Sequence, residues 1–188
     1  MENFKAKDMI LVALFAALTA IGAFIKIPIP YVPITLQVLF CAYSGLLLGA
    51  RRGLYSQLLY LAVGLIGIPI FTNGGGPAYV LQPTFGYLVG FALCSYIIGK
   101  VTENVKEYKL HKVFGAVLLG LMGLYICGLT HLYLIMNFYM HKSMSVSAVL
   151  GVGLIPFIPT DLLSAIIASL SSIYVLPILR RTGLLHSN

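Results

Sequence analysis

An isolated carboxylate lies within the apolar part of the chain. Asp161 follows the segment Ile155-Pro156-Phe157-Ile158-Pro159-Thr160 near the start of a long uncharged run. A carboxylate accepts hydrogen bonds from N–H groups, and an acid near a membrane helix is costly unless it is paired, so Asp161 is a candidate for ligand binding. A structural alternative stays open, because an aspartate near a proline-marked helix start caps free backbone N–H groups and suits the helix dipole.

An uncharged loop is the second candidate. The segment from Gly53 to Gly99 contains no Asp, Glu, Lys or Arg, and it is interrupted by Ile68-Pro69-Ile70-Phe71-Thr72-Asn73-Gly74-Gly75-Gly76-Pro77. Glycines allow backbone conformations that other residues avoid, and loops longer than about 12 residues usually have a function. The loop can therefore fold over a ligand, with a flexible connection as the alternative. Its candidate binding residues are Asn73, Gly74, Gly75, Tyr79 and Gln82.

Membrane helices must position these residues. Hydrophobic residues make up 60% of the 188 residues, charged residues make up 9%, and the mean hydropathy is +0.98. Such a chain has too few polar residues to cover a water-facing surface, so a soluble globule is not expected. We predict an all-α membrane protein that forms a single integral membrane domain over residues 1–188.

Six membrane-spanning helices are predicted from the uncharged runs and from the Pro and Gly residues that bound them, since a bilayer core needs about 20 apolar residues per helix. The predicted ranges are 8–26, 34–50, 53–68, 84–102, 113–138 and 157–181. Hydropathy does not decide whether Ser143 to Ile155 is a loop or a short interfacial or re-entrant helix.

The basic residues predict the orientation. In the arrangement with six helices, Lys26 and Lys142 lie on one side, and all other Lys and Arg residues lie on the opposite side. The larger group is Lys5, Lys7, Arg51, Arg52, Lys100, Lys106, Lys109, Lys112, Arg180 and Arg181. Because cytoplasmic segments are rich in Lys and Arg, both termini are expected in the cytoplasm. The glycine loop and Asp161 would then meet at the outer face.

The net charge of +7 follows from this bias and from attraction to anionic lipid, so no nucleic-acid partner is expected. Cys41, Cys94 and Cys127 lie singly within predicted helices. They lack the paired spacing of a zinc site or a disulfide framework, so we predict packing roles for all three and no metal site.

Small residues four apart allow close contact between helices. The pairs are Ala13 with Ala17, Ala16 with Ala20, Gly45 with Gly49, and Gly86 with Gly90. Packing inside the bundle is the favoured interpretation for the glycine pairs. For the alanine pairs of the first helix, a docking face for a partner protein is equally open, because a terminal helix has a free side.

Several motifs follow one another in a characteristic order. They are Val32-Pro33-Ile34-Thr35-Leu36-Gln37, Gly45, Leu48-Gly49, Arg52-Gly53, Tyr60-Leu61, Gly64, Gly67, Pro69, Phe71, the Gly74 cluster, Leu81-Gln82-Pro83-Thr84-Phe85-Gly86-Tyr87 and Gly90-Phe91. In this order they resemble BioY, the biotin-specific substrate-binding (S) component of energy-coupling factor (ECF) transporters. The resemblance covers about residues 10 to 95 and returns at Pro156-Phe157-Ile158-Pro159-Thr160-Asp161.

The resemblance implies an S component of six helices in a bacterial plasma membrane, which captures biotin from outside and is not an enzyme. It also implies a transmembrane coupling protein and two ATP-binding subunits as partners. In that family an Ala-x-x-x-Ala surface of the first helix contacts the coupling protein, and Ala13 and Ala17 match it here. The chain has no Gly-x-x-x-x-Gly-Lys-Ser/Thr loop, so the partners would use the ATP and no cofactor is expected.

The chemistry of biotin assigns roles to the candidate residues. Its ureido ring offers two N–H donors and one carbonyl, so Asp161 would accept from an N–H while Asn73 or Gln82 donates to the oxygen. Gln37 is a further polar candidate. The sulfur-containing ring would be covered by Tyr79, Tyr87 or Phe157.

Ser164 departs from the family pattern, because BioY members often carry Lys three residues after this Asp. A cation for the biotin carboxylate is therefore missing at that position. Lys26, His141 or Lys142 would substitute for it, or the acid chain would end in solvent.

Two other functions are alternatives to biotin capture. A hydrolase built from Ser164, His131 and Asp161 is not expected, because His131 lies in mid-helix and no nucleophile elbow surrounds Ser164. A structural subunit, or an S component for another small vitamin or metabolite, remains the alternative, since a similar outer-loop design would serve a different ligand.

Overall fold

The computed structural model describes residues 5–103 and 109–181, and within them helices predominate. The α-helices are α1 (Ala6–Phe24), α2 (Gln37–Leu48), α3 (Ala50–Ile66), α4 (Phe85–Glu103), α5 (Leu110–Leu134), α6 (Val146–Gly153) and α7 (Ile158–Arg181). Two short 3-10 helices, η1 (Pro77–Leu81) and η3 (Ile155–Phe157), and a π-helix, η2 (Ile135–Tyr139), connect or extend them. Lys106 and the side chains of Arg180 and Arg181 lie outside the described part of the chain.

Each predicted helix has a counterpart, but the structure does not establish six spans. Within the described residues four segments are long and apolar enough to cross a bilayer: Ala6–Phe24, Phe85–Glu103, Leu110–Tyr139 and Val146–Leu179. Helix α2 has 12 residues, which is about 18 Å and too short to span alone, and α3 has 17. The undecided segment after Ser143 contains α6, whose start is capped by Ser145. The chain is thus a membrane protein, and the number of crossings stays a prediction.

A two-stranded ribbon separates α1 from α2 in the mostly helical fold. Strands β1 (Lys26–Ile27) and β2 (Ile34–Thr35) pair antiparallel, with Lys26 opposite Thr35. Helix α2 therefore begins at Gln37, three residues later than expected. The reason is local: prolines at 28, 30 and 33 prevent a helix, and the β-branched residues that flank them favour extended backbone.

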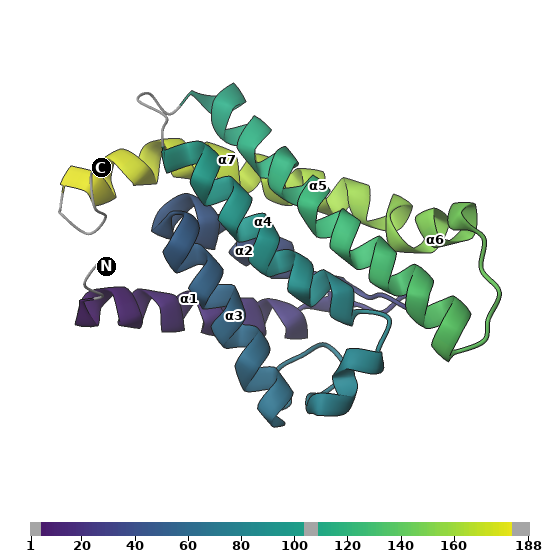
Figure 1. Cartoon of the computed structure of the whole chain (residues 1–188). Helices are drawn as coiled ribbons and strands as arrows, with labels where there is room; N and C mark the ends of the chain where they lie inside the picture. Colours follow the sequence, from purple (N-terminus) through teal and green to yellow (C-terminus); the bar gives the residue numbers. More distant parts are fainter. Residues whose placement is uncertain (1–4, 104–108, 182–188) are drawn as a thin grey trace.

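Helix α4 is the centre of the bundle. It packs against α5 on one side and against α2 and α3 on the other (Figure 1). A Cβ atom on Gly90 would lie 2.7 Å from the carbonyl oxygen of Leu124 on α5, and one on Gly45 would lie 2.6 Å from that of Ser95 on α4. Internal packing is therefore confirmed for these glycines, whereas Gly49 has a positive φ of 81° and ends α2.

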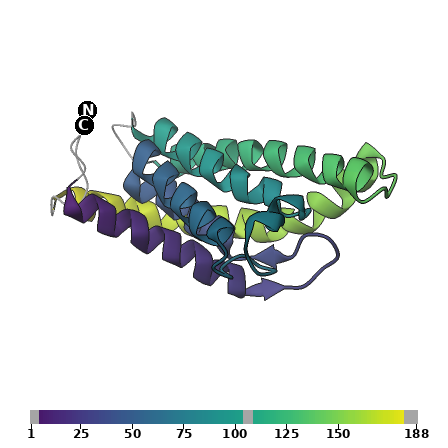
Figure 2. The ribbon, with the colours of Figure 1, turned by 60° about the horizontal axis from the view of Figure 1, so that its bottom comes forward.

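The Lys and Arg residues whose side chains are described, apart from Lys26 and Lys142, gather at one end of the bundle. The start of α1, the α2–α3 junction, the end of α4 and the start of α5 lie together there, with the end of α7 beside them (Figure 2). We call this the basic end, and the opposite end, which carries β1 and β2, the ribbon end. At the basic end Arg52 Nε lies 3.3 Å from Asp8 Oδ1, and the backbone N–H of Ala50 donates to Glu103.

The Arg52–Asp8 ion pair is expected to stabilise this end. Their side chains are 15% and 3% exposed, so Arg52→Gln leaves a buried carboxylate without its charged partner. We expect the free energy of unfolding to fall by about 1–3 kcal/mol. Thermal unfolding in detergent, followed by circular dichroism, measures it. The control is Lys112→Gln, which changes an exposed cation at the same end; equal unfolding midpoints for both variants would contradict the expectation.

Candidate functional site

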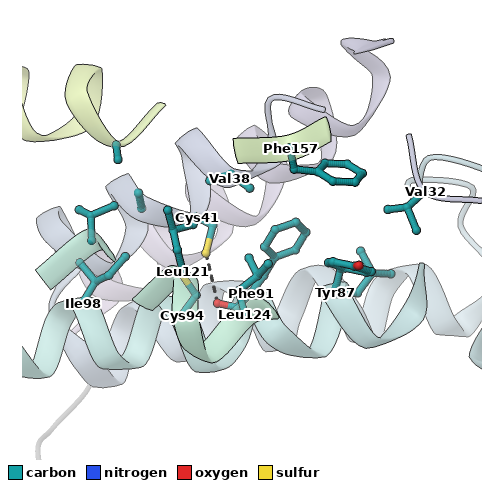
Figure 3. Packing of buried hydrophobic residues seen from close by; sticks show 14 of the residues in the cluster. Val32, Val38, Cys41, Tyr87, Phe91, Cys94, Ile98, Leu121, Leu124 and Phe157 are labelled. Carbon is teal, nitrogen blue, oxygen red and sulfur yellow. Dashed lines mark hydrogen bonds between the residues drawn. The ribbon is translucent and has the colours of Figure 1, made fainter. Parts of the chain in front are cut away.

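A cavity lies at the ribbon end, between the β1–β2 ribbon and helices α2, α4, α5 and α7. The space between its lining atoms is about 470 Å³ when the open mouth is included. Its apolar wall includes Val32, Val38, Phe91, Leu124 and Phe157, which gather on one side of the core, away from Ile98 (Figure 3). Its polar wall is Thr35, Gln37, Thr72, Thr84, Tyr87, Tyr125 and Asp161.

Asp161 forms the deep end of this cavity. It lies in the first turn of α7 and is 4% exposed, and its carboxylate accepts a hydrogen bond from the hydroxyl of Tyr125. Tyr125 precedes the end of α5 by nine residues, about 13 Å along the helix. Within the described residues no backbone N–H of α7 donates to this carboxylate, so the capping alternative is not observed. The carboxylate is instead free to accept a further bond from the cavity side.

The glycine loop closes on itself and turns its aromatic residues inward. Phe71 pairs with Gly74 in an isolated bridge and is 1% exposed, with its ring 5.3 Å from that of Tyr60 and 4.6 Å from that of Tyr79. The turn needs positive φ at Gly74, 112°, which glycine adopts without strain. Because Phe71 is anchored inside, its neighbour Thr72 faces the cavity and Asn73 lies exposed at the turn.

Hydrogen bonds fix this loop against the bundle. Tyr60 accepts from the side-chain amide of Gln37 at 2.9 Å and donates to the carbonyl oxygen of Ile70 at 3.1 Å. The Tyr79 hydroxyl lies 3.0 Å from the hydroxyls of both Thr72 and Thr84. The loop therefore presents a defined wall to the cavity rather than a flexible connection.

The structure divides the predicted site residues into two groups. Gln37, Tyr87, Phe157 and Asp161 line the cavity, and Tyr79 lies directly behind its wall. The other predicted residues do not line it: Asn73, Gly74, Gly75 and Gln82. Asn73 and Gln82 are exposed, and a Cβ on Gly75 would lie 2.4 Å from the carbonyl oxygen of Ile68, so this glycine serves the turn itself. The loop and Asp161 line the same cavity, and the loop residue in the lining is Thr72 rather than Asn73.

Residues that the sequence interpretation missed complete the lining. Thr72 precedes Asn73 and Thr84 lies two residues after Gln82, so their position between α3 and α4, at the predicted outer face beside Asp161, was the available signal. Tyr125 was harder to find. It shares one face of α5 with Leu121, Leu124 and Gly128, and its contact with Asp161 joins residues 36 positions apart.

The cations that could bind the acid group of a ligand differ in their contacts with the cavity lining. Ser164, where the resemblance to the family led us to expect a lysine, is 5% exposed and does not line the cavity. The Lys26 ammonium donates to the carbonyl oxygen of Thr72, a lining residue. Lys142 Nζ lies 5.5 Å from the centre of the Tyr31 ring, and His141 is exposed.

The geometry offers no support for a hydrolase. His131 Nε2 lies 3.2 Å from the carbonyl oxygen of Gln82, and its ring packs on Phe85, whereas the partner of Asp161 is Tyr125. Among the described residues no group of three His, Cys, Asp or Glu side chains could hold a metal ion. Cys41 and Cys94 are fully buried in the core, in agreement with packing roles.

Helix α1 presents two different faces. Thr19 is buried and shares hydrogen bonds with Gln57 of α3, and Ala16 is buried beside it. Ala13 and Ala17 are exposed on the opposite face. The two alanine pairs are therefore not equivalent: one faces the bundle, and the other is available to a neighbour.

Fold and site together define a helical membrane protein with a small-molecule cavity at one end. A sequence model of the BioY family matches residues 1–181, and the chain belongs to this family. Its relatives include the "Probable biotin transporter BioY" of Lysinibacillus sphaericus, which is 45% identical over 87% of this chain and 83% of the relative. The "Biotin transporter BioY" of Thermotoga maritima is 35% identical over 87% and 92%.

The bundle also matches a crystal structure described as the S-component for biotin from an ECF-type ABC transporter. The TM-score is 0.80, the sequences are 28% identical, and the match covers 94% of each chain. The expected S-component-like fold is thereby confirmed.

Proposed function

We propose that this chain is the biotin-binding S component of an ECF-type uptake transporter. It is not an enzyme; its activity is to capture biotin and to deliver it with an energy-coupling module. The names of its relatives and the likeness to the crystallised S-component for biotin support this function. One observation in the chain itself supports biotin binding most strongly: the buried carboxylate of Asp161 faces a cavity whose described lining holds no Lys, Arg or His. Such a site suits a neutral ring with N–H donors.

The proposed binding mode follows from the lining. Asp161 accepts a hydrogen bond from a ureido N–H, and the ureido oxygen accepts from Gln37, whose amide has a second N–H beyond the one bonded to Tyr60. The rings of Tyr87 and Phe157, 6.3 Å apart, cover the sulfur-containing ring. Gln37 thus takes the role that the sequence interpretation gave to Asn73 or Gln82.

The proposed topology places the basic end in the cytoplasm of a bacterial cell, so that both termini are cytoplasmic and the cavity opens outward. The four long apolar segments cross the membrane, and α2 and α3 complete a bundle of six spans within a single domain. Lipid surrounds the exposed apolar side chains. ATP is used by two partner subunits, and the chain itself needs no cofactor.

Titration of the purified protein tests this function. Biotin is expected to bind with nanomolar affinity, and desthiobiotin, which lacks the sulfur ring, more weakly because it loses apolar contact. Mass spectrometry of the ligand that co-purifies with the protein gives a second readout. Weak and equal binding of both compounds, or recovery of a different metabolite, would favour the alternative of another ligand.

We also propose that the exposed face around Ala13 and Ala17 docks on the transmembrane coupling protein. Small side chains permit close helix contact, so Ala17→Trp is expected to abolish co-purification with the coupling module while biotin binding is retained. Ile126→Trp, which enlarges a residue that is 65% exposed on α5, is the control and should assemble normally. Normal assembly of both variants would contradict this docking surface.

A further inference from the structure

Two independent contacts place Lys26 at the rim of the cavity. Its ammonium donates to the carbonyl oxygen of Thr72, and Thr72 lines the cavity. In the ribbon Lys26 is the cross-strand partner of Thr35, which also lines the cavity. Cross-strand partners project their side chains from the same face of a ribbon, so the register itself directs Lys26 to the cavity side.

The rim and the deep end carry opposite charges. The backbone N–H of Leu36 donates to the carbonyl oxygen of Gly22. The start of α2 therefore lies beside the last turn of α1, and Lys26 follows Gly22 by about one turn. Asp161 lies further in, at the level of Tyr125 in mid-α5. A ligand with an acid group would be repelled by the carboxylate at the deep end and attracted to the ammonium at the rim.

We propose that Lys26 binds the carboxylate of the ligand at the rim of the cavity. This inference rests on the proposed function, because biotin has its acid group at the end opposite the ureido ring. An ammonium has three donors, of which the Thr72 contact uses one, so Lys26 can hold the loop and the ligand at once. Bound ligand would then tie the ribbon to the glycine loop across the mouth.

Other cations fit this role less well. Position 164 is occupied by serine, which carries no charge and does not line the cavity. Lys142 is held over Tyr31, which is not a lining residue. The remaining lysines and arginines whose side chains are described lie at the basic end, away from the cavity.

The test compares biotin with biotinamide, which has a neutral amide in place of the acid and keeps both rings. In wild-type protein biotin is expected to bind about 10- to 100-fold more tightly than biotinamide, as expected for a hydrogen bond to a charged group. In Lys26→Gln this ratio falls to about one, because biotin binding weakens while biotinamide binding is unchanged. Lys26→Arg preserves the ratio, and so does the control Lys142→Gln.

Each contrary outcome identifies what is wrong. If Lys26→Gln weakens both ligands equally, Lys26 only holds the loop and the inference is overturned. The inference is also overturned if the preference for biotin over biotinamide is unchanged in Lys26→Gln or is lost in Lys142→Gln. It is overturned as well if wild-type protein binds both compounds with about equal affinity. If wild-type protein binds neither compound, the proposed function fails, and this inference fails with it.

Discussion

Asp161→Ala is expected to weaken biotin binding by about 30-fold or more. Truncating one partner of a buried, charge-assisted hydrogen bond costs about 2–5 kcal/mol, because the other partner remains buried and unpaired. Here the unpaired group would be a ureido N–H of the bound ligand. Isothermal titration of the purified variant with biotin measures the loss.

A second measurement separates binding from folding. Without ligand, the Asp161 carboxylate is buried with one hydroxyl partner among the described residues, which is a costly arrangement. We therefore expect the ligand-free variant to unfold at the same temperature as wild-type protein or higher. Ser164→Ala, one turn further along α7 and outside the lining, is the matched control and should bind normally. Tight binding by Asp161→Ala would remove this residue from the site.

Gly99→Ala is expected to cause the largest loss of stability. A Cβ atom at Gly99 would lie 2.2 Å from the backbone nitrogen of Ala50 and 2.4 Å from the carbonyl carbon of Gly49. Both atoms belong to the backbone of the α2–α3 junction, so no side chain can rotate away and the helices must separate. Overpacking of this kind costs about 1–3 kcal/mol and more where the backbone must shift.

Gly115→Ala is the matched control for Gly99→Ala. Gly115 also lies in a helix near the basic end, and a Cβ there would meet no atom within 4 Å. Alanine favours the helix over glycine by about 1 kcal/mol, so this variant should be as stable as wild-type protein or slightly more stable. Thermal unfolding in detergent compares them, and equal midpoints for Gly99→Ala and wild-type protein would show that the contact between α4 and the α2–α3 junction is not tight.

Much of the fold was predictable because membrane helices have a strong local signal. Uncharged runs gave helices close to α1, α3, α4, α5 and α7. The ribbon was missed, because pairing of Lys26 with Thr35 is a contact between segments that local hydropathy does not detect. Hydropathy does not establish the number of membrane spans, because α2 is short and α3 carries two arginines in its first turn.

The site was predictable only in part. Asp161 was identified because an acid in an apolar segment needs an explanation, and motif order pointed to Gln37, Tyr87 and Phe157. Asn73 does not line the cavity, and composition does not reveal which side of a turn faces a cavity. Burial of Phe71 against Tyr60 decides that direction, and it depends on tertiary contacts.

A structure of the protein with biotin bound tests the central claim most directly. The claim predicts a ureido nitrogen within hydrogen-bond distance of a carboxylate oxygen of Asp161, with the glycine loop covering the ligand through Thr72. Biotin in another location, or in this cavity with its ureido ring turned away from Asp161, would contradict it.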